Sequence, residues 1–431
     1  MSYVHLLFHW IFYRWVFFPI TLLFLYVVAP FHDKLQRGLD LRKKQNGLYP
    51  WQTITLKNAL WIHVSSGEFE YAKPLIASLK SHAPELKIVV SFFSPSVKKV
   101  LANDPLIDGY FPLPFDHPFF LAPLFRHLKP RMLLVARTDL WPELLLQAKK
   151  YSVKTILFSA TLSETAPKFK NPLKRSYAKW RFQLVDEIYC VDDEDKKTFE
   201  SLALRDRTQV FGDTRYDQVL RRLAQPRALR SELHPPKKYV TFLAGSTWLP
   251  DEEVLKETLQ KLQGLPIRFI IAPHEPTPDH LAQLKKLFQD LSIKTHLYTE
   301  AKSDWYLEPS VLIINQVGIL ADLYSWAQLA LVGNSFLRDK IHSVMEPLAA
   351  GCITFVGPKH RNNREALIFQ KLLIQNISPA VIVVQNSEEL AKNIQTLIKV
   401  DLASVQHHLK NKVLEKTGAS EKLAQKILFN T

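Results

Sequence analysis

Glycine and cysteine are both scarce in this chain. Only 12 of its 431 residues are glycine, about 3% against a typical share of about 7%, so each glycine is expected where the backbone needs one. The two cysteines, Cys190 and Cys352, lie far apart and form no CxxC pair. This pattern excludes a disulfide scaffold and a cysteine zinc site, and it fits a reducing compartment.

Two kinds of site are missing from the pattern. No GxxxxGK[ST] segment occurs, which argues against a P-loop NTPase. The acidic run Asp192–Asp195 follows an expected strand and precedes an expected helix, so we interpret it as a helix cap rather than a metal site. We therefore expect neither a metal ion nor a cofactor.

Negative charge is also in short supply, because 56 lysines and arginines face 41 acidic residues and the formal net charge is +15. Such a balance indicates an anionic partner: a nucleic acid, a membrane surface or a phosphorylated substrate. The N-terminus favours the membrane, since Trp15–Phe31 carries no charge and the apolar stretch reaches back to Tyr3. The run is near the ~20 residues that a span requires. We expect a membrane anchor, either spanning or interfacial, and no nucleic-acid partner.

A cluster of cations directly after this run places the following chain on the cytoplasmic side. Its members are Lys34, Arg37, Arg42, Lys43 and Lys44.

Beyond residue 50, strand-like and helix-like segments alternate in two series, which predicts two Rossmann-like α/β domains facing each other across a cleft. We expect an anchor and basic segment over 1–44, a first domain over 45–220, a linker over 221–238, and a second domain with closing helices over 239–431. The expected strands of the first series are Leu60–Ser65, Lys87–Phe93, Arg131–Ala136, Lys154–Ser159 and Glu187–Val191. Those of the second series are Tyr239–Ala244, Ile267–Ala272, Val311–Asn315, Leu329–Gly333, Ile353–Gly357 and Ala380–Val384.

Ligands bind such sheets at the carboxyl ends of strands, so the strand-to-helix junctions are the expected site. At the first junction a strand ends at Ser65 and Ser66, Gly67 makes the turn, and Glu68 opens a helix. A carboxylate there either stabilises its own helix dipole or acts as a general base that deprotonates a hydroxyl. Glu70 is the neighbouring candidate, but it points elsewhere on the helix.

The junctions of the second series carry polar and small residues suited to a nucleotide. Ser246, Thr247 and the free amides beside them could hold a phosphate. Residues 333–365 form the densest group, with ribose-binding acceptors and phosphate-binding donors. The residues predicted to bind the donor are Ser246, Thr247, His274, Gly318, Ser335, His342, Glu346, Lys359 and Asn362.

Several segments of the sequence resemble, in order and over nearly the whole chain, the 3-deoxy-D-manno-octulosonic acid (Kdo) transferases of lipopolysaccharide synthesis. WIHVSSGE looks like that family's H-x-x-S-x-G-E segment, and RTDLWPELL looks like its E-T-E-L-W-P segment. SATLSE, FGDTRYD, AGSTWLPDEE, APHEP and GPKHRNN follow in the family's order.

This resemblance implies a GT-B fold and an inverting, metal-independent transfer of Kdo from CMP-Kdo to a hydroxyl of the lipid A precursor lipid IVA. Glu68 matches the proposed catalytic base of the family. The enzyme would work on the cytoplasmic face of a cell inner membrane, whose lipids would be a further partner. The residues expected to bind the phosphorylated acceptor are Ser65, Ser66, Gly67, Thr138, Asp139, Lys168 and Lys170.

Several positions depart from the family pattern. Arg137 stands at the first glutamate before the Trp-Pro pair, Thr161 replaces an arginine, and Ile319 replaces a donor-side carboxylate. Ser343 also departs from the family's H-N-P-L-E segment. Two alternatives therefore stay open: a divergent GT-B enzyme with another CMP- or UDP-sugar donor, and a non-catalytic paralogue that binds lipid A.

Overall fold

The computed structural model describes residues 9–163, 171–289, 291, 293–339 and 341–429. The chain divides into two compact units. The N-terminal unit joins residues up to Gln218 with those from Thr417 onward, and the C-terminal unit holds Val219–Lys416. The last helix, which we expected in the second domain, therefore belongs to the N-terminal unit.

The N-terminal unit is built on a sheet of seven parallel strands in the order β3-β2-β1-β4-β5-β6-β7. Its central strands are buried along their whole length, as expected for a sheet covered on both faces. In spatial order the strands are β3 Gly109–Pro112, β2 Ile88–Phe92, β1 Leu60–Val64, β4 Met132–Ala136, β5 Lys154–Ala160, β6 Glu187–Cys190 and β7 Thr208–Val210.

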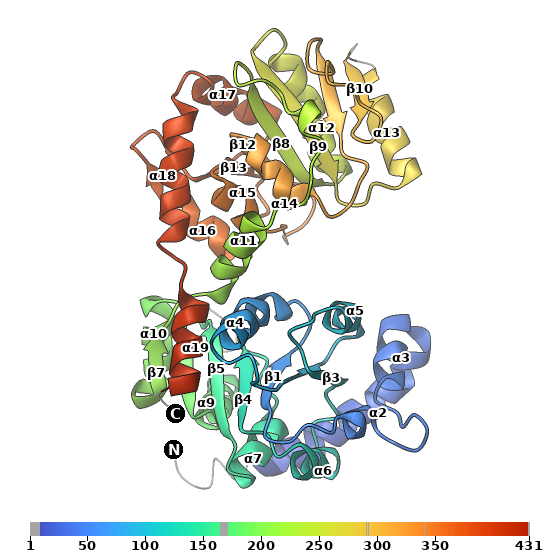
Figure 1. Cartoon of the computed structure of the whole chain (residues 1–431), viewed down its shortest axis with the longest axis vertical. Helices are drawn as coiled ribbons and strands as arrows, with labels where there is room; N and C mark the ends of the chain where they lie inside the picture. The colour runs from blue at the N-terminus through green and yellow to red at the C-terminus, as the bar shows by residue number, and fades with distance from the viewer. Residues whose placement is uncertain (1–8, 164–170, 290, 292, 340, 430–431) are drawn as a thin grey trace. The chain divides into compact units, whose positions relative to one another are not determined.

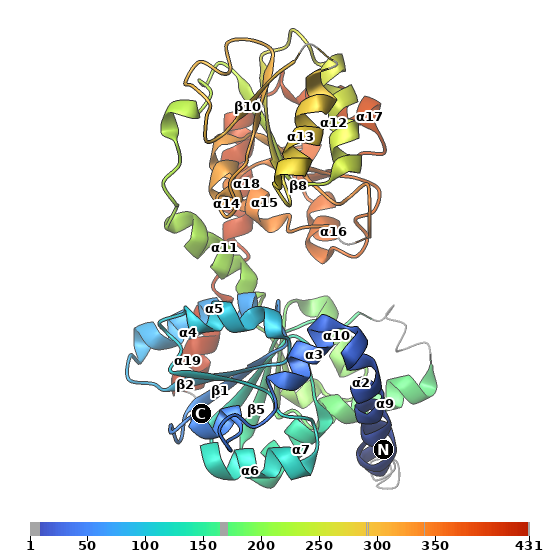
Figure 2. The ribbon, with the colours of Figure 1, turned by 90° about the vertical axis from the view of Figure 1, so that its right-hand side faces the viewer.

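Helices cover this sheet in two layers. Figure 2 shows α6 and α7 on one face and α4 with α19 on the other, and two separate apolar cores fill the layers. The helices are α4 Phe69–His82, α5 Lys98–Ala102, α6 Pro118–Leu128, α7 Pro142–Lys150, α9 Pro172–Gln183, α10 Asp193–Glu200 and α19 Ala419–Phe429. Short 3-10 turns lie at η3 Pro50–Thr53, η4 Pro95–Val97 and η5 Arg205–Arg207.

The C-terminal helix α19 packs beside α4, although the two are separated by more than three hundred residues (Figure 1). Leu423 and Ile427 are buried in the core under α4. The Asp217 carboxylate accepts hydrogen bonds from the backbone N–H groups of Gly418 at 2.6 Å and Ser420 at 2.7 Å. Burial and these two bonds explain why the last segment completes the N-terminal unit.

A helical N-terminal segment precedes the sheet. The continuous helical run His9–Phe31 is long and apolar enough to cross a membrane, and little of it is buried. It contains one π-helical turn, η1 Tyr13–Phe17, followed by α2 Phe18–Val28 and η2 Ala29–Phe31, and then α3 Asp33–Asp40. Such π turns occur often at functional sites.

The C-terminal unit is built on a second sheet of seven parallel strands. In spatial order they are β10 Lys294–Leu297, β11 Ser310–Ile313, β9 Ile267–Pro273, β8 Val240–Thr247, β12 Leu329–Val332, β13 Ile353–Val356 and β16 Val381–Val383. The short antiparallel pair β14 Leu373–Ile374 and β15 Ser378–Pro379 lies outside it.

The helices of this unit pack around the sheet: α12 contacts α13 and α17, while α15 contacts α18. They are α12 Leu249–Lys261, α13 Pro278–Gln289, α14 Leu320–Leu323, α15 Met345–Ala350, α16 Arg364–Gln370, α17 Ser387–Leu397 and α18 Leu402–Leu414, with 3-10 turns at η6 Ser231–Leu233 and η7 Tyr324–Trp326. The helix α11 Thr214–Ala224 begins in the N-terminal unit and ends in the C-terminal one. The linker expected over 221–238 thus starts inside a helix, and its residues belong to the C-terminal unit.

Candidate active site

Each sheet reverses its strand order at one place. In the N-terminal unit the chain runs outward from β1 to β3 and then returns to β4 on the other side of β1. In the C-terminal unit β8 and β12 are neighbours in the same way. Open α/β sheets bind ligands at the carboxyl ends of the strands at such points. The predicted site residues follow these four strands or lie at the carboxyl ends of neighbouring strands.

The loop after β1 presents Glu68 at the start of α4. Its Oε2 atom accepts a hydrogen bond of 3.0 Å from the backbone N–H of Ser66, and the side chain is half-buried. A Cβ placed on Gly67 would meet nothing within 4 Å, so the space beside this loop is open. Glu70, by contrast, is exposed and paired with Lys73 at 2.9 Å. The geometry separates the two acids as the sequence indicated: Glu68 is held in the loop and Glu70 lies on the helix surface.

The loop after β4 is bound to the loop after β1 through Asp139. Its carboxylate accepts a hydrogen bond from the Ser65 hydroxyl and lies 3.0 Å from Nε2 of His63. Burial alone would raise the pKa of Asp139, but the contacts with His63, Ser65 and Trp141 outweigh it and lower that pKa. Asp139 is therefore an ionised positioning residue that fixes the Ser65 loop.

His63 is a site residue that our prediction omitted. It is fully buried in β1, and its Nδ1 lies 2.9 Å from the Ser91 hydroxyl, which accepts from the Trp61 indole at 2.7 Å. Because that hydroxyl already accepts one bond, we assign its hydrogen to Nδ1 of His63, which leaves the imidazole proton on Nε2 facing Asp139. A histidine inside an otherwise apolar strand was the sequence signal that could have revealed it.

Two arginines flank the ring of Tyr71 on α4. The guanidinium carbon of Arg215 lies 4.5 Å from the ring centroid and that of Arg137 lies 5.2 Å away. Arg137 has a backbone φ of +60°, a strained left-handed conformation of the kind that clusters at functional sites. Its Nη2 lies 3.4 Å from the hydroxyl of Thr161, so the arginine of this pair directly follows β4 and the threonine directly follows β5. Asp213 binds Arg215 at 2.8 Å.

The remaining predicted acceptor residues are divided. Ser66 bonds Ser96 through its hydroxyl at 2.8 Å, and the Thr138 side chain is half-buried in the loop after β4. Lys168 and Lys170 lie outside the described residues. Of the basic stretch that continues from them along α9, Arg181 reaches this loop, with Nη1 3.4 Å from the carbonyl oxygen of Leu140.

In the C-terminal unit the loops after β8 and β12 approach each other closely. A Cβ on Gly333 would lie 2.2 Å from the Ser246 carbonyl oxygen, so only glycine fits. The Asp251 carboxylate accepts hydrogen bonds from the backbone N–H groups of Trp248 at 2.9 Å and Asn334 at 2.8 Å. Ser246 and Asn334 both have positive φ, at +55° and +68°. Left-handed backbone of this kind, at the end of β8 and just after β12, is common at functional sites.

Two of the residues predicted to bind the donor use their side chains for hydrogen bonds within the protein. Thr247 is fully buried and its hydroxyl donates to Glu252 at 2.8 Å, while the buried Ser335 hydroxyl donates to the Val332 carbonyl at 2.9 Å. Glu252 also lies 3.0 Å from Nε2 of His280 and raises its pKa against the effect of burial. These two hydroxyls fix the loops and are not directed at a ligand.

Three aromatic rings lie next to one another beside the β8 loop, and two of them are stacked. His274, after β9, lies with its ring centroid 5.1 Å from that of Trp248 and 4.3 Å from that of His342. The sequence separates the two histidines by 67 positions, and the fold makes them neighbours. The ring N–H groups of the two histidines could donate to a sugar carboxylate or a phosphate.

The other predicted donor residues contact protein groups. Glu346, at the start of α15, pairs with Arg222 at 3.0 Å. Gly318 has a φ of +88°, and its carbonyl accepts from Arg227 at 2.7 Å. The two remaining donor groups bond backbone carbonyls at the same edge: Lys359 Nζ to Leu337 at 3.0 Å and Asn362 Nδ2 to Asp339 at 2.9 Å.

The acidic run after β6 is a helix cap, as the sequence indicated. The Asp192 carboxylate accepts from the Asp195 backbone N–H at 2.9 Å at the start of α10, and Asp195 in turn accepts from the Leu162 N–H at 2.7 Å. Within the described part of the chain, no three His, Cys, Asp or Glu side chains gather where they could hold a metal ion.

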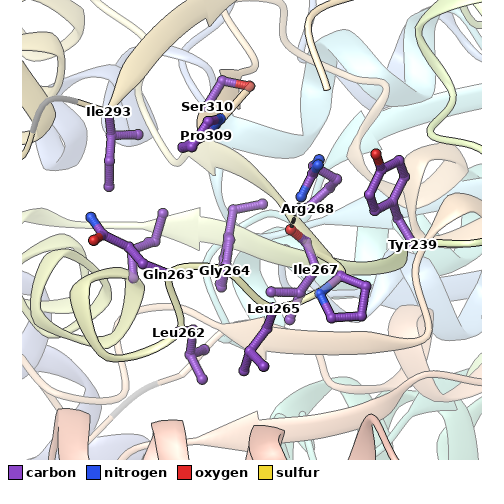
Figure 3. Close-up of a pocket in the computed structure, with 13 residues that line it drawn as sticks. Tyr239, Leu262, Gln263, Gly264, Leu265, Ile267, Arg268, Ile293, Pro309 and Ser310 are labelled. Atoms are coloured by element: carbon purple, nitrogen blue, oxygen red, sulfur yellow. Dashed lines mark hydrogen bonds between the residues drawn. The ribbon is translucent and has the colours of Figure 1, made fainter. Parts of the chain in front are cut away.

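A pocket of about 310 Å³ in the C-terminal unit lies at the end of the sheet opposite to the candidate site (Figure 3). It is lined by residues at the amino ends of the strands, including Ile267 and Ser310. The arginine in its lining, Arg268, already has protein partners. Its guanidinium lies 3.8 Å from the Tyr239 ring centroid and donates a hydrogen bond of 2.5 Å to the Tyr306 carbonyl. This pocket is separate from the candidate site.

Comparison with known proteins identifies relatives of this chain. The family model described as "3-Deoxy-D-manno-octulosonic-acid transferase (kdotransferase)" matches residues 38–218. A 3-deoxy-D-manno-octulosonic acid transferase of Chlamydia muridarum is 28% identical over 69% of this chain and 70% of its own length. One of Aquifex aeolicus is 26% identical over 80% of this chain and 87% of its own length.

Among solved structures, the UDP-GlcNAc 2-epimerase of Neisseria meningitidis bound to UDP-GlcNAc superposes with a TM-score of 0.60 at 13% identity. The match covers 86% of this chain and all of that one. A glycosyltransferase of Rickettsia africae superposes with a TM-score of 0.52 at 14% identity, over 87% of this chain and all of that one. The GT-B fold expected from the sequence is confirmed. The expected resemblance is confirmed as well, and the protein is a glycosyltransferase related to the Kdo transferases of lipopolysaccharide synthesis.

Proposed function

We propose that the protein transfers Kdo from CMP-Kdo to a hydroxyl of a phosphorylated lipid A precursor, lipid IVA. The acceptor oxygen attacks the anomeric carbon of Kdo while the bond from that carbon to the CMP phosphate breaks. Glu68 takes the proton of the attacking hydroxyl, and CMP leaves with the bonding electron pair. One such displacement inverts the anomeric configuration and uses no metal ion.

The observation that carries this proposal is the position of Glu68. Its carboxylate lies at the carboxyl end of β1, beside the point where the strand order reverses, with Oε2 fixed by the Ser66 N–H. Among the described residues, Oε1 accepts no side-chain or backbone hydrogen bond. A carboxylate oriented by one oxygen and available through the other is suited to general-base catalysis.

The C-terminal unit would hold the donor. Its β8 and β12 loops are strained, and the stacked pair His274 and His342 lies beside them. The relatives carry the name of Kdo transferases, which supports CMP-Kdo as the donor. Backbone amides and the nearby cation Lys359 would bind the CMP phosphate as it leaves.

The acceptor would lie against the N-terminal unit. The guanidinium groups of Arg137 and Arg215 both lie against Tyr71 on α4, the helix that Glu68 precedes. Two positive charges there suit the phosphates of a glycolipid. The exposed apolar run His9–Phe31 supports attachment to the cytoplasmic face of an inner membrane, where such a lipid is made.

The test is a transfer assay with detergent-solubilised protein, CMP-Kdo generated in situ and tetraacylated lipid A precursor, with products weighed by mass spectrometry. Wild type should add the mass of Kdo, and Glu68→Gln should lower kcat by about 10²–10⁴-fold. Glu70→Gln is the matched control, because it makes the same change two residues along the chain and should retain activity. A parallel reaction with a chelator tests metal independence.

Three results would contradict the proposal. Equal rates for Glu68→Gln and wild type would remove Glu68 as the base. Transfer from another CMP- or UDP-sugar, but not from CMP-Kdo, would replace the donor. If the folded wild type transfers no sugar but binds the lipid, the protein is a non-catalytic lipid A binder.

A further inference from the structure

A cavity of about 530 Å³ lies in the N-terminal unit between the apolar N-terminal helix and the loops of the sheet. One wall is the inner side of α2, with Thr21, Leu22 and Leu25. The facing walls come from α3, from the loops after β2 and β3, and from Trp141 ahead of α7. The cavity is therefore bounded on one side by the apolar N-terminal helix and on the other by the loops after β2 and β3, with Trp141 from the loop after β4.

The N-terminal helix is docked along its length on this unit. The Tyr13 hydroxyl donates to Asp116 at 2.5 Å, the Phe18 ring stacks on His117 at 5.2 Å, and Tyr26 lies 6.5 Å from Phe115. These contacts extend over thirteen residues, or about 20 Å of helix. A helix held in this way lies against the folded unit instead of leaving it.

The outer side of the same helix is apolar and exposed. Ile20, Leu23, Phe24 and Val27 each expose between 61% and 67% of their surface. A helix that packs one side against a folded unit and turns apolar side chains outward on the other is suited to lie along a membrane surface. The cavity behind it is then at the depth where lipid acyl chains begin.

Part of the cavity wall is connected to the candidate acceptor loops. The rings of Phe93 and Trp141 stack at 4.8 Å in its wall. Trp141 comes two residues after Asp139, and the backbone N–H of Ser94 donates to the Ser65 carbonyl at 2.9 Å. A backbone hydrogen bond thus joins the wall of the cavity to the loop that precedes Glu68.

Among the lining residues, Arg42 is the arginine, and its guanidinium is hydrogen-bonded to backbone carbonyl groups. Arg42 donates to the carbonyl oxygens of Gly38 at 2.7 Å, Leu113 at 2.8 Å and Phe93 at 2.9 Å. Burial lowers the pKa of Arg42 to about 10. Its charge is satisfied by the wall, so the interior remains suited to an apolar occupant, while the exposed Lys34 among the lining residues could meet a lipid phosphate.

From this arrangement we propose that the cavity receives one fatty acyl chain of the phosphorylated lipid acceptor, an inference that rests on the proposed function. An acyl chain has no polar groups to satisfy in an apolar cavity, whereas a peptide backbone would leave its own unpaired. The acceptor's own chain is favoured over bulk lipid because the cavity wall, through Ser94 and Trp141, is connected to the loops that would hold the acceptor sugar. Acyl binding then sets the register of the sugar hydroxyl relative to Glu68.

The main test fills the cavity. A Cβ on Gly38 would meet only Arg42 Nη1 at 3.7 Å and Pro95 Cγ at 3.9 Å, both ordinary contacts, so Gly38→Leu fits and adds helix propensity. Each buried CH₂ changes affinity by about fourfold, so loss of two to three should raise the KM for tetraacylated acceptor by about 10–60-fold. The matched control is Gln36→Leu, which introduces the same side chain on α3 outside the cavity.

The rate with a fully deacylated, water-soluble acceptor distinguishes this effect from a general defect. It should be equal in wild type and Gly38→Leu, because that acceptor has no chain to place. A KM for the tetraacylated acceptor that Gly38→Leu leaves unchanged would overturn the proposal. A parallel loss with both acceptors would also overturn it, because the damage would then not depend on the chain.

A second measurement does not depend on sugar transfer. Bromine atoms on an acyl chain quench a nearby indole, so lipid acceptor with brominated chains should quench the fluorescence that differs between wild type and Trp141→Phe. Gly38→Leu should abolish this quenching. Equal quenching by brominated phospholipid vesicles would overturn the proposed occupant in favour of bulk lipid. Quenching by the acceptor in a protein that transfers no Kdo would support the chain site and contradict the proposed reaction.

Discussion

Replacing Arg14 should unfold the N-terminal unit much more readily than replacing an exposed arginine. Arg14 forms a two-pronged ion pair with Glu143 on α7, with N–O distances of 2.8 Å and 3.1 Å. The side chains expose 16% and 1% of their surface. Arg14→Met would leave the Glu143 carboxylate buried with only the Gln147 amide as a partner.

Breaking one side of a buried pair costs about 3–5 kcal/mol. For a domain of this size, 1 kcal/mol corresponds to about 2–4 °C in Tm, so Arg14→Met should lower the melting temperature by about 6–20 °C. The assay is thermal unfolding in detergent at fixed protein concentration. The control is Arg205→Met, since Arg205 is 79% exposed and 3.6 Å from Glu200; it should cost under about 1 kcal/mol.

The double variant Arg14→Met/Glu143→Gln tests the reasoning itself. Neutralising the stranded carboxylate should recover most of the lost stability, because an uncharged amide costs less to bury than an unpaired carboxylate. A melting temperature for Arg14→Met equal to that of Arg205→Met would refute the argument that this pair is buried and coupled. A double variant no more stable than Arg14→Met would refute it as well.

Three further predictions concern the two units. Gly333→Ala should lower the melting temperature by the equivalent of about 1–3 kcal/mol and weaken CMP-Kdo binding by calorimetry, because its Cβ would overlap the Ser246 carbonyl. Asp139→Asn should lower kcat by up to about 10²-fold with little change in the donor KM, because it releases the Ser65 loop; an unchanged kcat would contradict that role. Burial raises the pKa of Asp116 to about 7, so the unfolded state loses this proton first and stability should fall as pH rises from about 4 to 7. Denaturant unfolding against pH should show that slope reduced in Asp116→Asn.

The sequence predicted the repeating α/β pattern because long buried strands such as β1 and β8 read as continuous apolar runs. It missed β3, β7 and β10, which are three or four residues long. These strands lie at or near the sheet edges, where burial is partial and their composition differs little from that of a loop. A strand could be predicted from the sequence where its burial requires apolar residues. It could not be predicted where only hydrogen bonding to a neighbouring strand defines it.

The site was predictable by position more than by role. Because ligands bind at the carboxyl ends of parallel strands, the sequence could select the loops of Glu68 and Ser246. It could not show that the hydroxyls of Thr247 and Ser335 bond within the protein, since that depends on which loops meet. Nor could it show that His63 faces Asp139, because one lies in β1 and the other in the loop after β4, and only the fold brings them together.

The chain passes between the units twice, once within α11 and once after Lys416. During synthesis, the core under α4 therefore waits for Leu423 and Ile427, which are made after the whole C-terminal unit. At about 5–20 residues per second, the roughly 200 intervening residues take about 10–40 s. The C-terminal unit is continuous in sequence and is the first that the ribosome delivers complete. The apolar N-terminal helix emerges long before its unit can close, so we expect the nascent chain to reach the membrane, or a chaperone, as an unfinished domain.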